Sequence, residues 1–262
     1  MTTTTDRVIT ALRSTHQDLA ATVNSMSNVK LAATSGAAPW TVAQVLSHLG
    51  SGAVITLATI EAATTGQTAP GSGFNQSTWD HWDALDPQAQ ADNLVLEDGR
   101  LISVLESLKE SERETLRIPQ DHLGPPMPLA GYAGMRLNEV VQHAWDIHTV
   151  LDPEATISSS TAALLAELFA TDLQFLLQFA GHADALEHPT VIDIKNSDYT
   201  LTIGTTVKLT LAKPPASAAF NGPLEAFIRL IAGRLRPSET RRRTYVTGNT
   251  TLDDLQTVFP GY

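Results

Sequence analysis

Residues 135–151 constrain the fold of this chain more than any other stretch. The segment contains no Gly or Pro, and its apolar side chains recur at helical spacing, with a turn of about 100° per residue. This pattern predicts an amphipathic helix that buries one side against other helices. The apolar side consists of Leu137, Val140, Val141, Ala144, Ile147 and Leu151.

The opposite side of this helix carries Arg136, Glu139, His143 and Asp146. Glu139 and His143 are four residues apart and are therefore neighbours on the helix surface. A carboxylate and an imidazole at this spacing are able to hold a divalent metal, and Asp146 is placed to orient a ligand. Such a pair is more often solvated, and two ligands do not make a site. A metal site is predicted only if the chain supplies a third ligand.

Composition excludes several classes of protein. The 262 residues are 42% hydrophobic and 17% charged, which predicts a folded globular core. There is no Cys, so disulfides, cysteine metal ligands and a catalytic protein thiol are excluded. The first residues precede no apolar signal core, and no run of about 18 apolar residues predicts a membrane span. A cytoplasmic protein fits these features.

Charge is distributed unevenly between two parts of the chain. Residues 1–180 contain eight Lys/Arg and twenty Asp/Glu, a balance of -12, whereas residues 181–262 contain nine and eight, a balance of +1. The asymmetry predicts two domains of different character, and the acidic N-terminal part argues against nucleic acid as a partner. The predicted domains are residues 1–152 and 153–262.

Four helices are predicted in the first domain. Thr41 and Gln44 form a Thr-x-x-Gln capping box, Trp40 before them has the position of a hydrophobic staple, and Asp86-Pro87 is a second helix start. The sequence between the helices predicts a long loop at 65–86 and a Pro-rich connection at 119–130. The aromatic residues and the histidine of the long loop either line a pocket mouth or pack the loop down; they are Phe74, Trp79, His81 and Trp82. The predicted helices are 5–27, 41–63, 87–108 and 135–151.

A four-helix bundle is the economical architecture for these helices. His48 lies on the second helix among small residues. A lone His there is more often an ordinary hydrogen-bonded residue than a ligand. In a bundle, however, it is able to meet Glu139 and His143, giving two histidines and a carboxylate with an open position, which suits zinc or non-haem iron.

The second domain changes pattern to a small α+β fold. A very apolar helix at 158–181 is predicted to link the two domains. Short strands rich in Val, Ile and Thr are predicted at 190–194, 199–203, 206–211, 216–220 and 244–246, and helices at 223–234 and 252–258.

Arginine is concentrated near the end of this domain, where six of the seventeen Lys/Arg lie within residues 229–243. The cluster either receives an anionic substrate or forms a solvated basic surface. We favour the solvated surface for Arg241–Arg243. Arg234, between an apolar helix and a turn, is the candidate to point inward.

Three motifs in order along the chain carry a resemblance to a known family, and the second is the most specific. They are Trp40-Thr41 with Val45-Leu46-Ser47-His48-Leu49; Met135-Arg136-x-x-Glu139-Val140-x-x-His143-Ala144-x-Asp146; and Gly222-Pro223-Leu224 through Leu230-Ile231-Ala232-Gly233-Arg234, closing with Phe259-Pro260-Gly261-Tyr262.

With these motifs the chain resembles the mycothiol-dependent maleylpyruvate isomerase family, which has a DinB-like N-terminal bundle. The resemblance implies a divalent metal, typically zinc, held by His48, Glu139 and His143. It also implies mycothiol, whose sulfur meets the metal, and a substrate or catalytic role for Arg234. His148 projects from another side of its helix and is predicted to be structural.

The expected function is a metal- and mycothiol-dependent isomerase or S-transferase acting on a small anionic electrophile. One alternative is a non-catalytic module of the same fold that binds a metal or ligand. Another is a C-terminal domain that carries sterol or lipid, against which the arginine cluster argues.

Overall fold

The computed structural model describes residues 2–120, 124–235 and 244–261. The chain divides into two compact units, Met1–Ala155 and Thr156–Tyr262. The division falls after Ala155, close to the boundary predicted after residue 152.

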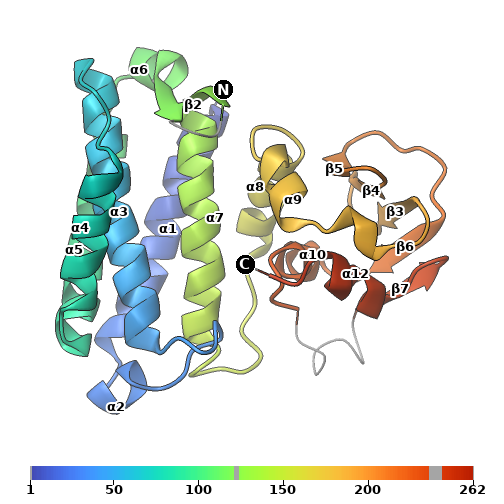
Figure 1. The fold of residues 1–262 in the computed structure, drawn as a ribbon, viewed down its shortest axis with the longest axis horizontal. Helices are drawn as coiled ribbons and strands as arrows, with labels where there is room; N and C mark the ends of the chain where they lie inside the picture. Colours follow the sequence, from blue (N-terminus) through green and yellow to red (C-terminus); the bar gives the residue numbers. More distant parts are fainter. Residues whose placement is uncertain (1, 121–123, 236–243, 262) are drawn as a thin grey trace. The chain divides into compact units, whose positions relative to one another are not determined.

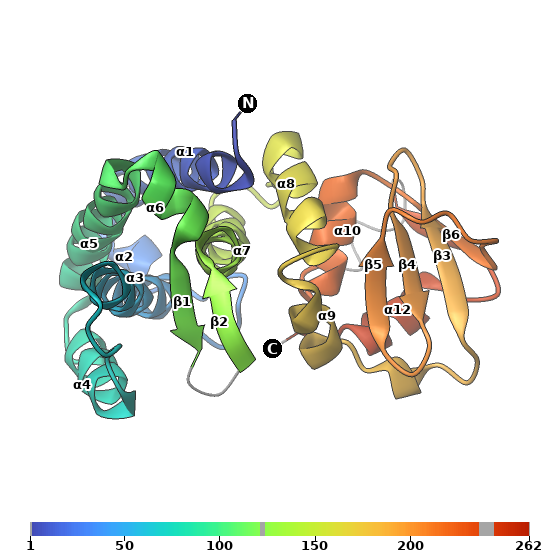
Figure 2. The ribbon, with the colours of Figure 1, turned by 90° about the horizontal axis from the view of Figure 1, so that it is seen from above.

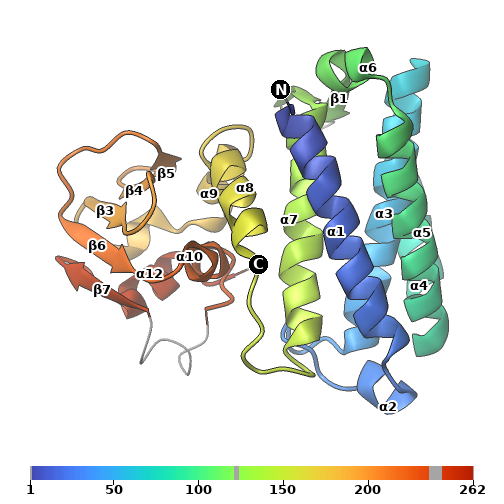
Figure 3. The same cartoon turned by 180° about the vertical axis from the view of Figure 1, so that it is seen from behind.

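The first unit is built on four long helices (Figure 1). α1 packs against α5 and α7, and α3 packs against the same two helices, so the four enclose one core (Figure 3). Fully buried leucines from all four helices, including Leu12, Leu46, Leu101 and Leu137, fill this core. The long helices are α1 (Thr4–Asn24), α3 (Val42–Thr65), α5 (Pro87–Ser107) and α7 (Leu129–His148).

Local capping explains where two of these helices begin. In the Thr41–Gln44 capping box, the Gln44 amide donates to Thr41 Oγ1 at 3.2 Å and the Thr41 amide donates to Gln44 Oε1 at 2.9 Å. Asp86 accepts from two backbone amides of α5, and Pro87 occupies the first turn, where no N–H is needed. The predicted helix starts at these two positions are therefore found in the structure.

The predicted long loop at 65–86 is wrong, because α4 (Ser72–Asp83) occupies most of it. The buried indole of Trp82 anchors this helix over Gly50 of α3, where a β-carbon would overlap the ring. Ser47 also donates to Asp83 at 2.8 Å. This contact with α3 is tertiary and leaves no periodic signal in the segment itself. Of the predicted loop, residues 66–71 and 84–86 lie outside helices.

Other predicted boundaries also need correction. The first helix ends at Asn24 and a short α2 (Asn28–Leu31) follows, while α7 starts at Leu129 rather than at residue 135. A helical turn, α6 (Glu110–Thr115), and a small antiparallel hairpin of β1 (Arg117–Gln120) and β2 (Gly124–Pro128) precede α7. The Pro-rich connection therefore contains strands, held by the fully buried Ile118 opposite Met127.

The side of α7 that carries Arg136 and Asp146 is not a solvated face. Both of these charged residues are buried, as is His143. α7 therefore places most of its polar side chains inside the protein, where each needs a hydrogen-bonding or charged partner.

The second unit is a five-stranded sheet with helices next to one face (Figure 2). The strand order is β5-β4-β3-β6-β7; β3 and β6 are parallel and the other pairs are antiparallel. Alternate side chains such as Ile192, Leu201, Leu209 and Phe220 are fully buried, which is the period-2 pattern of a sheet covered on one side. The strands are β3 (Thr190–Ile194), β4 (Thr200–Ile203), β5 (Val207–Thr210), β6 (Ala218–Asn221) and β7 (Tyr245–Gly248).

The predicted helix at 158–181 is two helices that meet at a bend of 86°. α8 (Ser159–Phe169) stops at Ala170, and α9 (Gln174–Ala180) starts after Leu173, whose side chain is fully buried. α10 (Leu224–Ile231), α12 (Leu252–Val258) and the 3-10 turn η1 (Ala183–Ala185) complete the unit.

Among the described residues, α3 is the one helix with the length and apolar composition of a membrane span, and α8 with α9 would make a second only as a bent pair. The most apolar window of α3 is 61% buried in the protein, as expected for the core helix of a bundle.

Candidate metal centre

His48, Glu139 and His143 lie together in the first unit. One potential ligand atom from each residue lies within 4.8 Å of the others. His48 Nε2 is 3.2 Å from Glu139 Oε2, and His143 Nε2 is 3.8 Å from the same oxygen. In the described part of the chain, no other group of three His, Asp or Glu side chains is close enough to hold one cation. The structure thus brings together the three residues that the resemblance implies as ligands.

The site is buried on one side and open on the other. The side chain of His143 is 9% exposed, whereas those of His48 and Glu139 are 39% and 34% exposed. His143 therefore forms the inner wall, and solvent reaches the other two groups. Two imidazole nitrogens and one carboxylate with an accessible side are the donor set of a catalytic zinc or non-haem iron site.

Asp146 fixes the orientation of His143. Its Oδ2 lies 2.9 Å from His143 Nδ1, and the residue is completely buried. An ionised carboxylate only accepts hydrogen bonds, so Nδ1 carries the proton and the lone pair of Nε2 faces Glu139. A histidine ligand is held in this way in many metal sites.

The loop before α3 packs closely on Asp146 through Gly36. The Gly36 amide donates to the Asp146 carbonyl oxygen at 2.8 Å. A β-carbon at Gly36 would lie only 2.8 Å from Asp146 Cα and 2.9 Å from Oδ1, so any larger residue would displace the carboxylate or the loop. Glycine is therefore required by close approach at this position.

Trp40 lies against both histidines. Its ring centroid is 5.4 Å from that of His48 and 6.2 Å from that of His143, and the residue is 40% exposed. The sequence predicts a hydrophobic staple here, and the structure also places the indole against the two histidines, as one wall of the site. The one sequence signal of this role is that Trp40 directly precedes the cap of the helix that carries His48.

The electrostatics of the site favour an ionised Glu139. Burial raises the pKa of this carboxyl group, but the hydrogen bond with His48 and the electrostatic influence of His143, His48 and Arg136 lower the pKa more. The net shift is downward, so Glu139 is a carboxylate at neutral pH, the form that binds a cation. His148, at the end of α7, is not part of the group.

The structure describes two of the six residues of the predicted arginine cluster, Arg229 and Arg234. Arg229 is buried and pairs with Glu225 one turn earlier on α10, at 2.8 Å. Arg234 is partly exposed and follows Gly233, whose φ of 69° produces the turn after α10; Arg234 Nη1 donates to the Ala232 carbonyl at 3.0 Å. Arg236 and Arg241–Arg243 lie outside the described residues.

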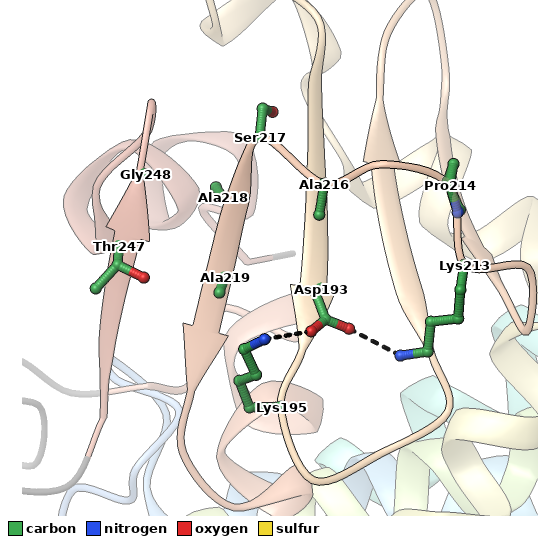
Figure 4. Close-up of a pocket in the computed structure, with 10 residues that line it drawn as sticks. All are labelled: Asp193, Lys195, Lys213, Pro214, Ala216, Ser217, Ala218, Ala219, Thr247 and Gly248. Atoms are coloured by element: carbon green, nitrogen blue, oxygen red, sulfur yellow. Dashed lines mark hydrogen bonds and ion pairs between the residues drawn. The ribbon is translucent and has the colours of Figure 1, made fainter.

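A separate hollow of about 440 Å³ lies on the outer face of the sheet in the second unit (Figure 4). Asp193 there lies between two lysines, 2.6 Å from Lys195 Nζ and 2.8 Å from Lys213 Nζ. The hydrogen bonds from these lysines lower the pKa of Asp193. The two lysines and one carboxylate of this hollow pair with one another and leave a net charge of +1, and none of the predicted site residues lines it.

The fold and this site define a helix-bundle protein in which two histidines and one carboxylate lie close enough together to hold a cation. Residues 12–148 match the family model described as the mycothiol maleylpyruvate isomerase N-terminal domain. Since the match covers more than half of the chain, the protein belongs to this family, as the sequence motifs predicted.

Solved structures show the same fold over nearly the whole chain. A crystal structure of the mycothiol-dependent maleylpyruvate isomerase is similar with a TM-score of 0.66 at 16% identity, covering 95% of this chain and 98% of that one. The structure of a histidine-to-alanine mutant of the mycothiol-dependent maleylpyruvate isomerase gives a TM-score of 0.64 at 16% identity, covering 89% and 92%. No curated protein matches the chain. The predicted α+β class, a bundle followed by a small α+β domain, is confirmed.

Proposed function

We propose that this protein is an enzyme that uses mycothiol and a divalent metal, most simply zinc, to act on a small anionic electrophile. The observation that carries the proposal is the convergence of His48, Glu139 and His143 on one side of a bundle that belongs to this family. Both maleylpyruvate-type cis–trans isomerisation and thiol S-transfer are compatible with such a centre. A cytoplasmic location agrees with a small thiol as co-substrate.

The three residues of the centre would hold the cation. The two imidazoles bind in their neutral form and Glu139 binds as a carboxylate, which leaves the exposed side for a further ligand. When bound there, the metal would stabilise the thiol as a thiolate nucleophile. In an isomerase the sulfur would add to the activated double bond and leave again after rotation, whereas in a transferase the C–S bond would be kept and the adjacent carbon would take up a proton.

The chain's other residues would orient and shield the reactants. Asp146 keeps the lone pair of His143 Nε2 directed into the site. The indole of Trp40 excludes water from one side and offers an apolar surface to the organic part of the thiol. Arg234 would bind the substrate carboxylate or stabilise the negative charge that develops on addition.

The test is turnover of maleylpyruvate by the zinc-loaded protein with and without mycothiol, with free thiol titrated at the end. We expect turnover only with mycothiol, and its loss in Glu139→Gln. The matched control is Glu114→Gln, which changes an exposed carboxylate of the same unit.

The fate of the thiol separates the two chemistries. An isomerase returns mycothiol unchanged, whereas a transferase consumes about one thiol per substrate as the C–S bond is kept. Equal rates without mycothiol, or in Glu139→Gln, would refute the proposal. Metal and thiol binding without turnover of any offered electrophile would favour the non-catalytic module.

A further inference from the structure

A chain of hydrogen-bonded polar groups crosses the bundle beside the candidate metal centre. His16 Nδ1 on α1 lies 3.0 Å from Asp98 Oδ2 on α5, and Asp98 Oδ1 accepts from Arg136 Nη2 on α7 at 2.7 Å. The same Nη2 donates to the carbonyl oxygen of Leu49 on α3 at 2.8 Å. Each of the four long helices therefore contributes one group to the chain.

The position of Arg136 relates this chain to the centre. Arg136 lies one helical turn before Glu139 on α7, and Leu49 directly follows His48 on α3. The bond between Arg136 and the Leu49 carbonyl therefore joins the two helices that carry the ligands, next to the ligands themselves.

The guanidinium is held tightly and has little room to move. The side chains of Arg136 and Asp98 are 5% and 2% exposed. A β-carbon at Gly52, on α3, would lie 3.0 Å from Arg136 Nη1, so a glycine there makes space for the guanidinium. Burial raises the pKa of Asp98, but the charge of Arg136 and the bond with His16 lower it more, so the carboxylate stays ionised as a partner.

Burying such a pair is a poor way to gain stability, because desolvation of both charges offsets most of their attraction. A fixed geometry is the better-supported use of a buried ion pair, since the planar guanidinium offers directed donors to two acceptors at once. Metal sites are sensitive to geometry, because ligand distances are held to within about 0.2 Å.

We propose that Arg136 is a positioning residue of the metal centre. By joining Asp98 on α5 to the Leu49 carbonyl on α3, it fixes the distance of His48 from Glu139 and His143. The inference rests on the proposed metal site and adds to it a residue that does not contact the cation.

The test uses Co²⁺, whose visible absorption reports coordination geometry as well as binding. Arg136→Lys keeps the positive charge but replaces the planar guanidinium, whose Nη2 donates to both acceptors, by a shorter side chain that ends in a freely rotating ammonium group. We expect Co²⁺ affinity to fall about 10-fold or more and the visible bands to shift in position and intensity. The matched control is Arg13→Lys, which alters an ion pair with Glu106 between α1 and α5 on the surface and should change neither readout.

A second variant keeps the inference testable if Arg136→Lys does not fold. Gly52→Ala retains every charge and presses a methyl group against the guanidinium, so it should shift the Co²⁺ bands in the same direction. Wild-type spectra and affinity in folded Arg136→Lys, or in Gly52→Ala, would overturn the positioning role. Failure of the wild type to bind Co²⁺ at all would instead refute the metal centre, and this inference with it.

Discussion

Replacing Asp146 by Asn should weaken zinc binding while leaving the bundle folded. Asp146 Oδ2 lies 2.9 Å from His143 Nδ1, and the carboxylate is completely buried. Asparagine has nearly the same size and still offers an oxygen to the Nδ1 proton. What it removes is the negative charge that makes the imidazole a stronger donor to a cation and favours one tautomer.

The expected loss of zinc affinity depends on whether the substituted side chain can still accept a hydrogen bond from His143 Nδ1. Loss of a group that orients a histidine ligand typically lowers metal affinity 10- to 100-fold, or about 1.4–2.7 kcal/mol. Because Asp146→Asn keeps an acceptor, we expect about 10-fold, near the lower end of that range. Asp146→Ala, which removes the acceptor altogether, should approach about 100-fold.

The assay is competition for Zn²⁺ with a chromophoric chelator of known affinity. Unfolding of the metal-free protein, followed by circular dichroism, separates lost affinity from lost stability. Asp193→Asn is the matched control, because it makes the same chemical change in the other unit, between Lys195 and Lys213. If Asp146→Asn binds zinc within about twofold of the wild type, the proposed orientation of His143 is wrong.

Three further perturbations test other parts of the molecule. Gly36→Ala should destabilise the metal-free protein by about 1–3 kcal/mol in urea unfolding, because the methyl group would lie 2.8 Å from Asp146 Cα; a change below about 0.5 kcal/mol would contradict the close packing. The pKa of Asp98 is lower in the folded chain, because the charge of Arg136 and the hydrogen bond with His16 outweigh the effect of burial. The ionised Asp98 therefore stabilises the fold above the unfolded pKa near 3.8, and this stabilisation is lost as the pH falls through the folded pKa. Asp98→Asn should therefore lower the free energy of unfolding at pH 7, and this free energy should decline less steeply below about pH 4 than in the wild type. Parallel pH profiles of the free energy of unfolding for variant and wild type would contradict this role of Asp98. Arg234→Lys should lower kcat/KM for an anionic substrate about 10-fold without changing zinc content, as measured by initial rates; an unchanged kcat/KM would remove Arg234 from the site.

The helices of the bundle were predictable where the signal is local. The caps at Thr41 and Asp86 and the apolar period of residues 135–151 need no knowledge of the rest of the fold. α4 was missed because its anchor, Trp82, acts through a distant glycine, Gly50. The β1–β2 hairpin was missed for a different reason, because its proline-rich sequence argues against strands.

The candidate site was predictable only in part. Glu139 and His143 follow from the spacing of one helix, and His48 needed both the bundle architecture and the family resemblance. The roles of Trp40 and Gly36 depend on how a loop folds back on α7, which no periodicity encodes. Arg136 was assigned to a polar side that would ordinarily face solvent, and its burial results from a partner on α5, far away in sequence.

The metal content per chain tests the central claim most directly. Wild type and Glu139→Ala, purified without chelators and without a His tag, would be measured by plasma mass spectrometry before and after incubation with zinc. We predict about one equivalent in the wild type and little in the variant, since Glu139 is one of the three proposed ligands. No metal in either protein, and no uptake of added zinc by the wild type, would contradict a metal-dependent function.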